Sequence, residues 1–266
     1  MHRIKLLAPA LASATALLVA GSYVTSSPQT DGPVLTAAAA VVPTLAVATA
    51  PAPAAVAMET ESALAALSGA VTGLSHPKAL EDAFRSYFAY KAAHPDAVRK
   101  PYLYFVDYGQ PSTARRGWVF DMTSLAVVDG PFTVAHGRGS STSQYGVPTR
   151  FSNASGSAAT SLGLYVAQET YAFVGHSAGR VYRSIGVRLQ GVSDGINDNA
   201  RARGVVAHGA PYVTASRAGR SEGCPAMEPD RAARLLPKLA NGSLVFLFAP
   251  NDDWMAKDHW LADNVS

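Results

Sequence analysis

The chain has 266 residues, of which 48% are hydrophobic and 15% charged, with a formal net charge of +3 and one cysteine. This composition fits one globular domain with extra segments, and its weak, scattered positive charge argues against a nucleic-acid-binding protein. One cysteine excludes an intramolecular disulfide framework, and histidines without closely spaced acidic or cysteine partners predict no metal and no cofactor.

The first 24 residues have the pattern of an export signal. Arg3 and Lys5 form a basic head before the apolar run 6–24, and Ala20-Gly21-Ser22 supplies small residues for cleavage. The same run is long enough to span a bilayer if it stays uncleaved. We therefore predict an exported protein of the periplasm or cell envelope, with residues 1–24 as a signal peptide or, alternatively, a membrane anchor.

The next two segments differ in composition. Residues 25–59 are rich in Ala, Val, Thr and Pro, which predicts a disordered linker. From Thr60 to Leu74 apolar residues recur at helical spacing, and a second helix is expected after Ser75, with Pro77 in its first turn. Residues 60–95 are thus predicted to form a helical segment that packs on the domain that follows.

Residues 96–266 alternate short apolar runs with Gly, Ser, Asn and Pro clusters, which is typical of antiparallel strands joined by loops. Strands are expected at 102–106, 117–121, 125–128, 132–135, 162–167, 171–174, 187–189, 204–207 and 243–249. A helix is predicted to begin at Glu228 and to end near Ala240. The fold class is therefore mainly β with peripheral helices, and we expect a monomer.

The only cysteine stands in the stretch Gly223-Cys224-Pro225. Gly223 permits backbone conformations that a side chain would block, and Pro225 keeps Cys224 extended. An exported thiol can oxidise, so it should persist mainly when it is buried or when it does chemistry; a small buried hydrophobe is the alternative interpretation. Because Pro225 has no N–H, oxyanion donors would have to come from Cys224, Gly223 or another loop.

Activation of a thiol usually requires a neighbouring histidine. The strand region holds three histidines: His136, His176 and His208. His208 follows an apolar strand and lies 16 residues before Cys224 (224 − 208), a span that a loop can fold back across. His136 also ends a predicted strand and precedes a glycine, so the local sequence does not separate the two. Arg217 and Arg220 would add positive potential that favours the thiolate.

His208-Gly209, followed by Ser221-x-Gly223-Cys224, resembles the active-site signature of the L,D-transpeptidases. Further stretches, in the same order from about residue 80 to residue 248, are similar to the branch of murein (YkuD-type) L,D-transpeptidase catalytic domains. These stretches include Ala135-His136-Gly137-Arg138-Gly139, Phe151-Ser152-Asn153, Ser161-Leu162-Gly163, Asn197-Asp198-Asn199-Ala200-Arg201 and Gly219 through Ala226.

The resemblance implies a β-sandwich-like catalytic domain with Cys224 as nucleophile and His208 as its base, oriented by a group at Gly209. The implied partners are peptidoglycan stem peptides: the enzyme would cleave after the L-centre of diaminopimelate, release D-alanine and pass the acyl group to an amine or to water. A transpeptidase is the leading hypothesis. The alternatives are an L,D-carboxypeptidase with the same nucleophile and a non-catalytic peptidoglycan-binding module.

The sequence also departs from the family pattern. Many members have histidine before the Gly–Cys pair and arginine two residues after the cysteine, whereas this chain has Glu222 and Ala226. Whatever these two side chains contribute to binding the substrate carboxylates must then be supplied by other residues or be absent. The candidates for substrate contacts are Ser221, Arg220, Arg201 and His176, with Arg183 and Arg203 as further arginines. His136 is expected to be structural.

Overall fold

The computed structural model describes residues 53–261. The predicted export signal or anchor at 1–24 and most of the predicted linker lie outside these residues. Within the described range, no helix combines the length and apolar character that crossing a membrane requires.

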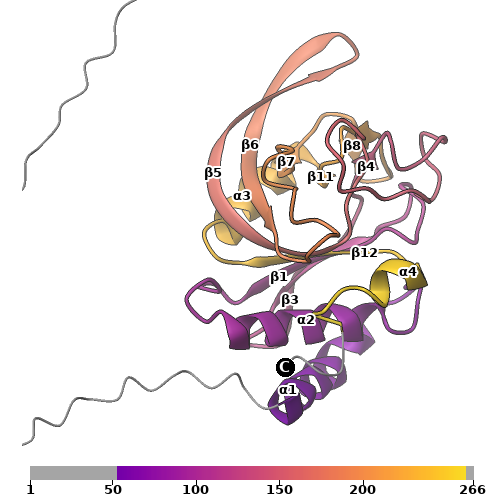
Figure 1. Ribbon diagram of the computed structural model, residues 1–266. Helices are drawn as coiled ribbons and strands as arrows, with labels where there is room; N and C mark the ends of the chain where they lie inside the picture. The colour runs from indigo at the N-terminus through magenta and orange to yellow at the C-terminus, as the bar shows by residue number, and fades with distance from the viewer. Residues whose placement is uncertain (1–52, 262–266) are drawn as a thin grey trace, which may run out of the picture. The chain divides into compact units, whose positions relative to one another are not determined.

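The centre of the fold is a mixed sheet of eight strands in the order β11-β7-β6-β5-β12-β1-β2-β3. Its strands are β1 (Tyr102–Asp107), β2 (Gly117–Asp121), β3 (Ala126–Phe132), β5 (Gly163–Ser177), β6 (Arg180–Gly191), β7 (Val206–Gly209), β11 (Ala226–Met227) and β12 (Leu244–Phe248). Strands β5 and β6 are long and bend strongly, so that the sheet curves towards its β7–β11 end (Figure 1). The predicted mainly-β fold class is confirmed.

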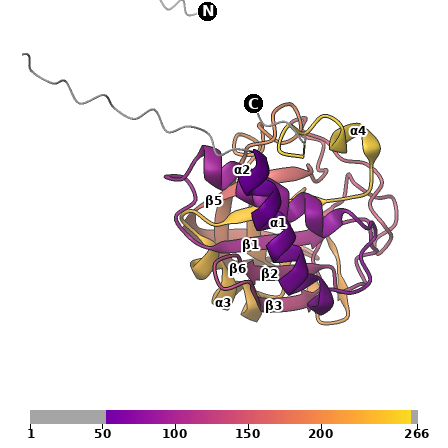
Figure 2. The ribbon, with the colours of Figure 1, turned by 90° about the horizontal axis from the view of Figure 1, so that it is seen from below.

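Two helices cover one face of this sheet. Helix α1 (Pro53–Leu67) and helix α2 (Ala79–Ala93) cross beneath strands β1 to β3 (Figure 2). From α2, the rings of Phe84, Tyr87 and Phe88 are buried in the core, because their spacing places them on one helical face. Strand β12 lies between β1 and β5 and is buried along its whole length, as a central strand covered on both faces should be.

The remaining elements are short and lie mostly around the β7–β11 end. They are η1 (Ser68–Ala70), β4 (His136–Gly137), β8 (Val213–Thr214), β9 (Arg217–Ala218), β10 (Arg220–Ser221) and α4 (Asp252–Met255), together with the longer helix α3 (Pro229–Leu239), which packs on β6 and β7. Two additional pairs, β10–β4 and β8–β9, form separate two-stranded sheets. The helix predicted at 228–240 is present as α3.

The N-terminal boundary of the helical segment differs from the prediction. Helix α1 begins at Pro53, not near Thr60, so the predicted linker is wrong for residues 53–59. Proline is well tolerated in the first turn of a helix and the alanines that follow favour helix, so the composition that suggested a linker also permits this start. The helix ends at Leu67 and is followed only by the short η1, because Gly69 and Gly73 disfavour its continuation.

The β5–β6 hairpin is also longer than predicted. The strands expected at 162–167 and 171–174 are one strand, interrupted by a register shift between Ala167 and Thr170. At the tip, Ala178 and Gly179 both have positive φ, of 49° and 74°, which is typical of a two-residue hairpin turn. The strand expected at 132–135 is not continuous: β3 ends at Phe132, and Ala135 makes only a bridge to Ala226.

Candidate functional site

The four residues Ser221 to Cys224, which we call the cysteine turn, connect β10 to the segment that leads into β11. The Ser221 hydroxyl donates a hydrogen bond to the Cys224 carbonyl (2.7 Å), and the Gly223 N–H donates to the Ser221 oxygen (3.2 Å). Gly223 has a φ of 122°, and a Cβ there would lie 2.8 Å from the Ala159 carbonyl oxygen, so only glycine fits. Because the Gly223 N–H already has an acceptor, the Cys224 N–H is the better oxyanion donor of this turn.

The strand register places the thiol beside β7. Strands β11 and β7 pair in parallel with Ala226 opposite His208, and extending this register by two residues sets Cys224 opposite Val206. The backbone N–H of Val206 acts on the Cys224 thiol and lowers its pKa, which is consistent with this placement. Cys224 and His208 are therefore on neighbouring backbone segments, offset by two residues, an arrangement that the 16-residue separation in sequence permits.

His208 is held in one orientation. Its Nδ1 lies 3.0 Å from the Gly209 carbonyl oxygen, and since a carbonyl only accepts, Nδ1 carries the proton and Nε2 is left as the basic nitrogen. The ring stacks on Phe173, with the centroids 4.1 Å apart and the planes inclined by 19°. Only 2% of the residue is exposed, and this burial lowers the pKa of His208 to about 4, so that its imidazole is neutral at pH 7.

The Cys224 thiol is also neutral at rest. Its pKa is raised to about 11: burial of the sulfur is the largest cause, the Val206 N–H and the Arg203 charge lower the pKa, and Glu222 raises it by a smaller amount. The prediction that Arg217 and Arg220 favour the thiolate is therefore wrong: desolvation dominates, and the arginine that opposes it is Arg203.

His136 is buried in a different way. Its Nδ1 lies 2.9 Å from a guanidinium nitrogen of Arg116, which can only donate, so Nδ1 is the acceptor and the proton is on Nε2. Among the described residues, Nε2 has no hydrogen-bond partner. Burial, and then the charges of Arg116 and Arg220, lower the pKa of His136 to about 3. His136 thus has the opposite tautomer from His208 and offers no basic nitrogen to a thiol.

A hollow of about 310 Å³ opens beside the thiol, and we call it the cysteine hollow. Its lining residues are Arg138, Gly156, Ala158, Arg203, Gly204, Val205, Glu222 and Cys224. Arg138 and Glu222 form an ion pair at its mouth (2.7 Å). Arg203 donates four hydrogen bonds to segment 152–161, whose acceptors are the Ser152 and Ala159 carbonyls and the Ser157 and Ser161 hydroxyls.

The structure does not bring all predicted substrate-contact residues to this hollow. The Ser221 hydroxyl is already bonded to the Cys224 carbonyl within the cysteine turn. The Arg220 guanidinium donates to the Ser141 and Thr142 carbonyls. Arg201 pairs with Glu169 (3.0 Å), away from the thiol.

His176 is not brought to the thiol either. It is exposed, and the alternation of the strand places it on the opposite face of β5 from Phe173, which contacts His208. Arg183 is on the corresponding outer face of β6, since the adjacent Ser184 accepts from the Gly209 N–H. Arg138, which does line the hollow, was not among the predicted substrate-contact residues, because its only signal in the sequence was its place in the stretch 135–139.

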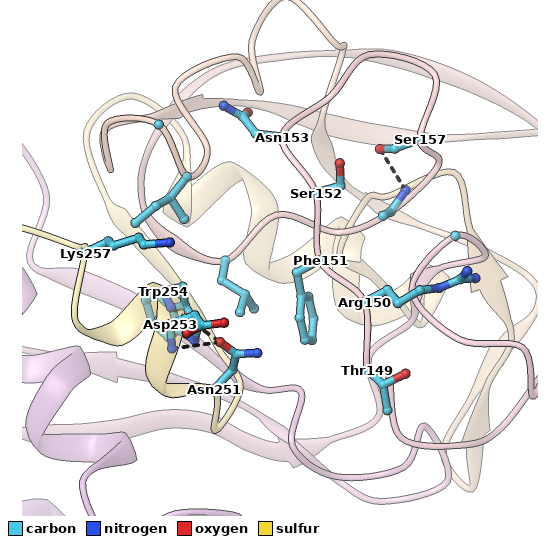
Figure 3. A pocket seen from close by; sticks show the side chains of 15 residues that line it. Thr149, Arg150, Phe151, Ser152, Asn153, Ser157, Asn251, Asp253, Trp254 and Lys257 are labelled. Atoms are coloured by element: carbon cyan, nitrogen blue, oxygen red, sulfur yellow. Dashed lines mark hydrogen bonds between the residues drawn. The ribbon is translucent and has the colours of Figure 1, made fainter.

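Figure 3 shows a second, larger hollow, of about 690 Å³. Phe151 lies in its middle, and Lys257, Asn251 and Asp253 line one side. The segment 156–159 separates the two hollows: Ser157 and Ala159 line the larger one, whereas Gly156 and Ala158 line the cysteine hollow. Cys224 lines the smaller hollow and not the larger one, whereas His208 lines neither, so the thiol alone makes the smaller hollow the candidate site.

Within residues 53–261, no group of three or more His, Cys, Asp or Glu side chains could hold a metal ion.

A family model for the L,D-transpeptidase catalytic domain matches residues 73–248. Similar solved structures include an L,D-transpeptidase from Mycobacterium smegmatis (16% identity, 56% of this chain and 59% of that chain covered, TM-score 0.33). Others are an L,D-transpeptidase from Xylanimonas cellulosilytica (14%, 56% and 61%, 0.33) and L,D-transpeptidase 3 from Mycobacterium tuberculosis (13%, 56% and 61%, 0.32). The chain thus spans about three fifths of these solved chains, and no curated protein matches it.

Proposed function

Because the chain belongs to the family of L,D-transpeptidase catalytic domains, we propose that it cross-links peptidoglycan by acyl transfer through Cys224. The observation that carries this proposal is the parallel β11–β7 register, which sets Cys224 beside the strand that contains His208. His208 has the tautomer that a base needs, because the Gly209 carbonyl fixes the proton on Nδ1.

In the first half-reaction, Nε2 of His208 takes the thiol proton as sulfur attacks the carbonyl of the diaminopimelate L-centre in a tetrapeptide stem. A carbon–sulfur bond forms, and the oxyanion accepts from the Cys224 N–H. The carbon–nitrogen bond to D-alanine then breaks, and the imidazolium returns its proton to the leaving amine. The products are a thioester on Cys224 and free D-alanine.

In the second half-reaction, an amine of a neighbouring stem attacks the thioester. His208 accepts a proton from this amine and gives it to the departing sulfur, so that an amide replaces the thioester and the neutral thiol is restored. Water could take the place of the amine, and the product would then be a tripeptide stem.

The neutral resting pair determines how the thiol is activated. With the pKa of Cys224 raised to about 11 and that of His208 lowered to about 4, proton transfer in the absence of substrate is strongly unfavourable. Proton transfer must therefore accompany attack on the substrate, which fits His208 as a general base and not as the permanent partner of a thiolate. A neutral thiol also resists oxidation, which suits the exported, envelope-facing location that we propose from the N-terminal sequence.

The test is product analysis after incubation with a purified disaccharide-tetrapeptide. We expect a cross-linked dimer and free D-alanine, both absent with Cys224→Ala. A tripeptide product without dimer would show a carboxypeptidase. Binding of the tetrapeptide with no product of either kind would show a non-catalytic binding module and contradict the proposal.

A further inference from the structure

The inference concerns the recognition of the substrate carboxylate, and it rests on the proposed function. The donor tetrapeptide ends in D-alanine, whose free carboxylate is one residue from the carbonyl that Cys224 attacks. This carboxylate must therefore lie in or at the mouth of the cysteine hollow. Of the residues that line this hollow, only Arg138 and Arg203 are cationic.

The two terminal nitrogens of Arg203 have no free N–H groups to donate to a ligand. Its four hydrogen bonds to segment 152–161 use both hydrogens of Nη1 and both of Nη2. Binding a substrate carboxylate there would break contacts that hold the wall between the two hollows. Arg203 is therefore a positioning residue whose charge acts on the thiol at a distance.

Arg138 has free donors and a fixed backbone. Its Nε contacts both carboxylate oxygens of Glu222, at 2.7 and 2.9 Å, and no hydrogen bond among the described residues uses its two Nη groups. Its backbone N–H donates to the Ser221 carbonyl (2.7 Å), which ties Arg138 to the first residue of the cysteine turn. The backbone of Arg138 is thus fixed beside the cysteine turn, and its side chain lines the same hollow as Cys224, with Nη donors that can face a ligand.

Another carboxylate can easily replace Glu222 in its ion pair with Arg138. Both side chains are mostly exposed, 61% for Arg138 and 71% for Glu222, and exposed ion pairs of this kind contribute little to stability. A carboxylate that enters the hollow can thus replace the Glu222 carboxylate at small cost. The forked guanidinium suits such a ligand, because it binds carboxylates through two parallel hydrogen bonds.

We propose that Arg138 binds the C-terminal carboxylate of the donor stem, and that Glu222 occupies this arginine until the substrate displaces it. Arg138 would then supply the carboxylate contact that the family arginine two residues after the cysteine cannot make here, where Ala226 stands. Glu222 competes with the substrate for the same guanidinium, and thereby sets the selectivity for stems that end in a free carboxylate.

The test measures acylation of Cys224 by intact mass as a function of the concentration of disaccharide-tetrapeptide, and of the same compound with its C-terminal carboxylate amidated. For the free carboxylate, we expect Arg138→Gln to raise the half-saturating concentration by about tenfold or more and to leave the maximal rate within about threefold. Glu222→Gln should lower the half-saturating concentration. For the amidated compound, we expect Arg138→Gln and the wild type to have the same half-saturating concentration. Arg234→Gln, on α3 and outside the hollow, is the matched control.

Opposite directions for the two substitutions are decisive. If the pair were only structural, Arg138→Gln and Glu222→Gln would shift half-saturation in the same direction, and the proposal would be overturned. It would also be overturned if Arg138→Gln raised the half-saturating concentration equally for the free and the amidated peptide. Calorimetric binding of the tetrapeptide to Cys224→Ala tests this inference without the reaction. If the affinity depends on Arg138 but the wild type is not acylated, the proposed function is contradicted and the role of Arg138 in binding the carboxylate stands.

Discussion

The regions around His208 and His136 show how two similar sequence patterns acquire different chemistry. Each histidine lies at a strand, precedes a glycine and is buried, and burial lowers the pKa of both. The Gly209 carbonyl accepts from Nδ1 of His208, whereas Arg116 donates to Nδ1 of His136. Nε2 of His208 is therefore unprotonated and basic, whereas Nε2 of His136 carries the proton and can only donate. The cysteine turn lies between these regions, because β10 pairs with β4 and β11 pairs with β7.

Replacing His208 should have the largest effect on activity. His208→Gln removes the general base, and we expect the acylation rate of Cys224 to fall by roughly 10²–10⁴-fold. Rapid-quench intact-mass measurements with the disaccharide-tetrapeptide give this rate. If His136→Gln caused the larger loss per folded molecule, the assignment of the base would be reversed.

Replacing His136 should instead weaken the fold. His136→Ala leaves one hydrogen of the buried Arg116 Nη2 without an acceptor, while the same nitrogen still donates to the Val134 carbonyl, and we expect a loss of about 1–3 kcal/mol in the free energy of unfolding. Urea denaturation monitored by tryptophan fluorescence measures this loss. His176→Ala, at an exposed position of the hairpin, is the control and should leave the midpoint unchanged.

The pH dependence of stability should reflect both histidines. Unfolded histidine binds protons below pH 6.5, whereas the folded pKa values of His208 and His136 are lowered to about 4 and about 3. The unfolded state therefore binds more protons in this range, so stability falls as the pH drops from about 6.5 to about 4, by at most about 1.4 kcal/mol per pH unit for each histidine.

Substituting either histidine with glutamine should remove its share of this slope. Asp82 acts in the opposite direction, because burial raises its pKa to about 6, so the test compares the slopes of the wild type and of each variant. Equal slopes in wild type and variant would show that the substituted histidine is not held neutral by the fold.

The smallest expected effect is a change in the pKa of Cys224, which should depend on Arg203 and not on Arg220. Arg203 lowers the pKa of Cys224, whereas Arg220 acts on His136. The midpoint pH for iodoacetamide alkylation of Cys224 should therefore rise in Arg203→Gln and stay unchanged in Arg220→Gln. A shift in Arg220→Gln of the same size would contradict the separation of the two regions.

The sequence predicted the elements whose pattern is local. The strands at 102–106 and 117–121 and the helix at 228–240 are present almost at the expected bounds, because each combines an apolar run with clear turn or cap residues. The β5–β6 hairpin was divided in the prediction because its bulge after Ala167 resembles a turn, and its tip uses Ala178 in a conformation that alanine rarely adopts.

The candidate site was predicted only in part. The sequence placed Cys224 and His208 in one signature, but it could not assign the tautomers, which depend on partners that are distant or belong to the backbone. It also assigned the activating charge to Arg217 and Arg220, near neighbours of Cys224 in sequence, whereas Arg203 is the arginine that lines the hollow with the thiol and lowers its pKa. Proximity in sequence is a poor guide here, because the cysteine turn packs against segments from three other parts of the chain.

The most direct test of acyl transfer through Cys224 is a single-turnover reaction with excess enzyme and disaccharide-tetrapeptide, quenched in acid and followed by peptide mapping. We expect one D-alanine to be released for each thioester formed, with the added mass on the peptide that contains Cys224. Release of D-alanine from the Cys224→Ala protein, or a covalent adduct on a different residue, would contradict acyl transfer through Cys224.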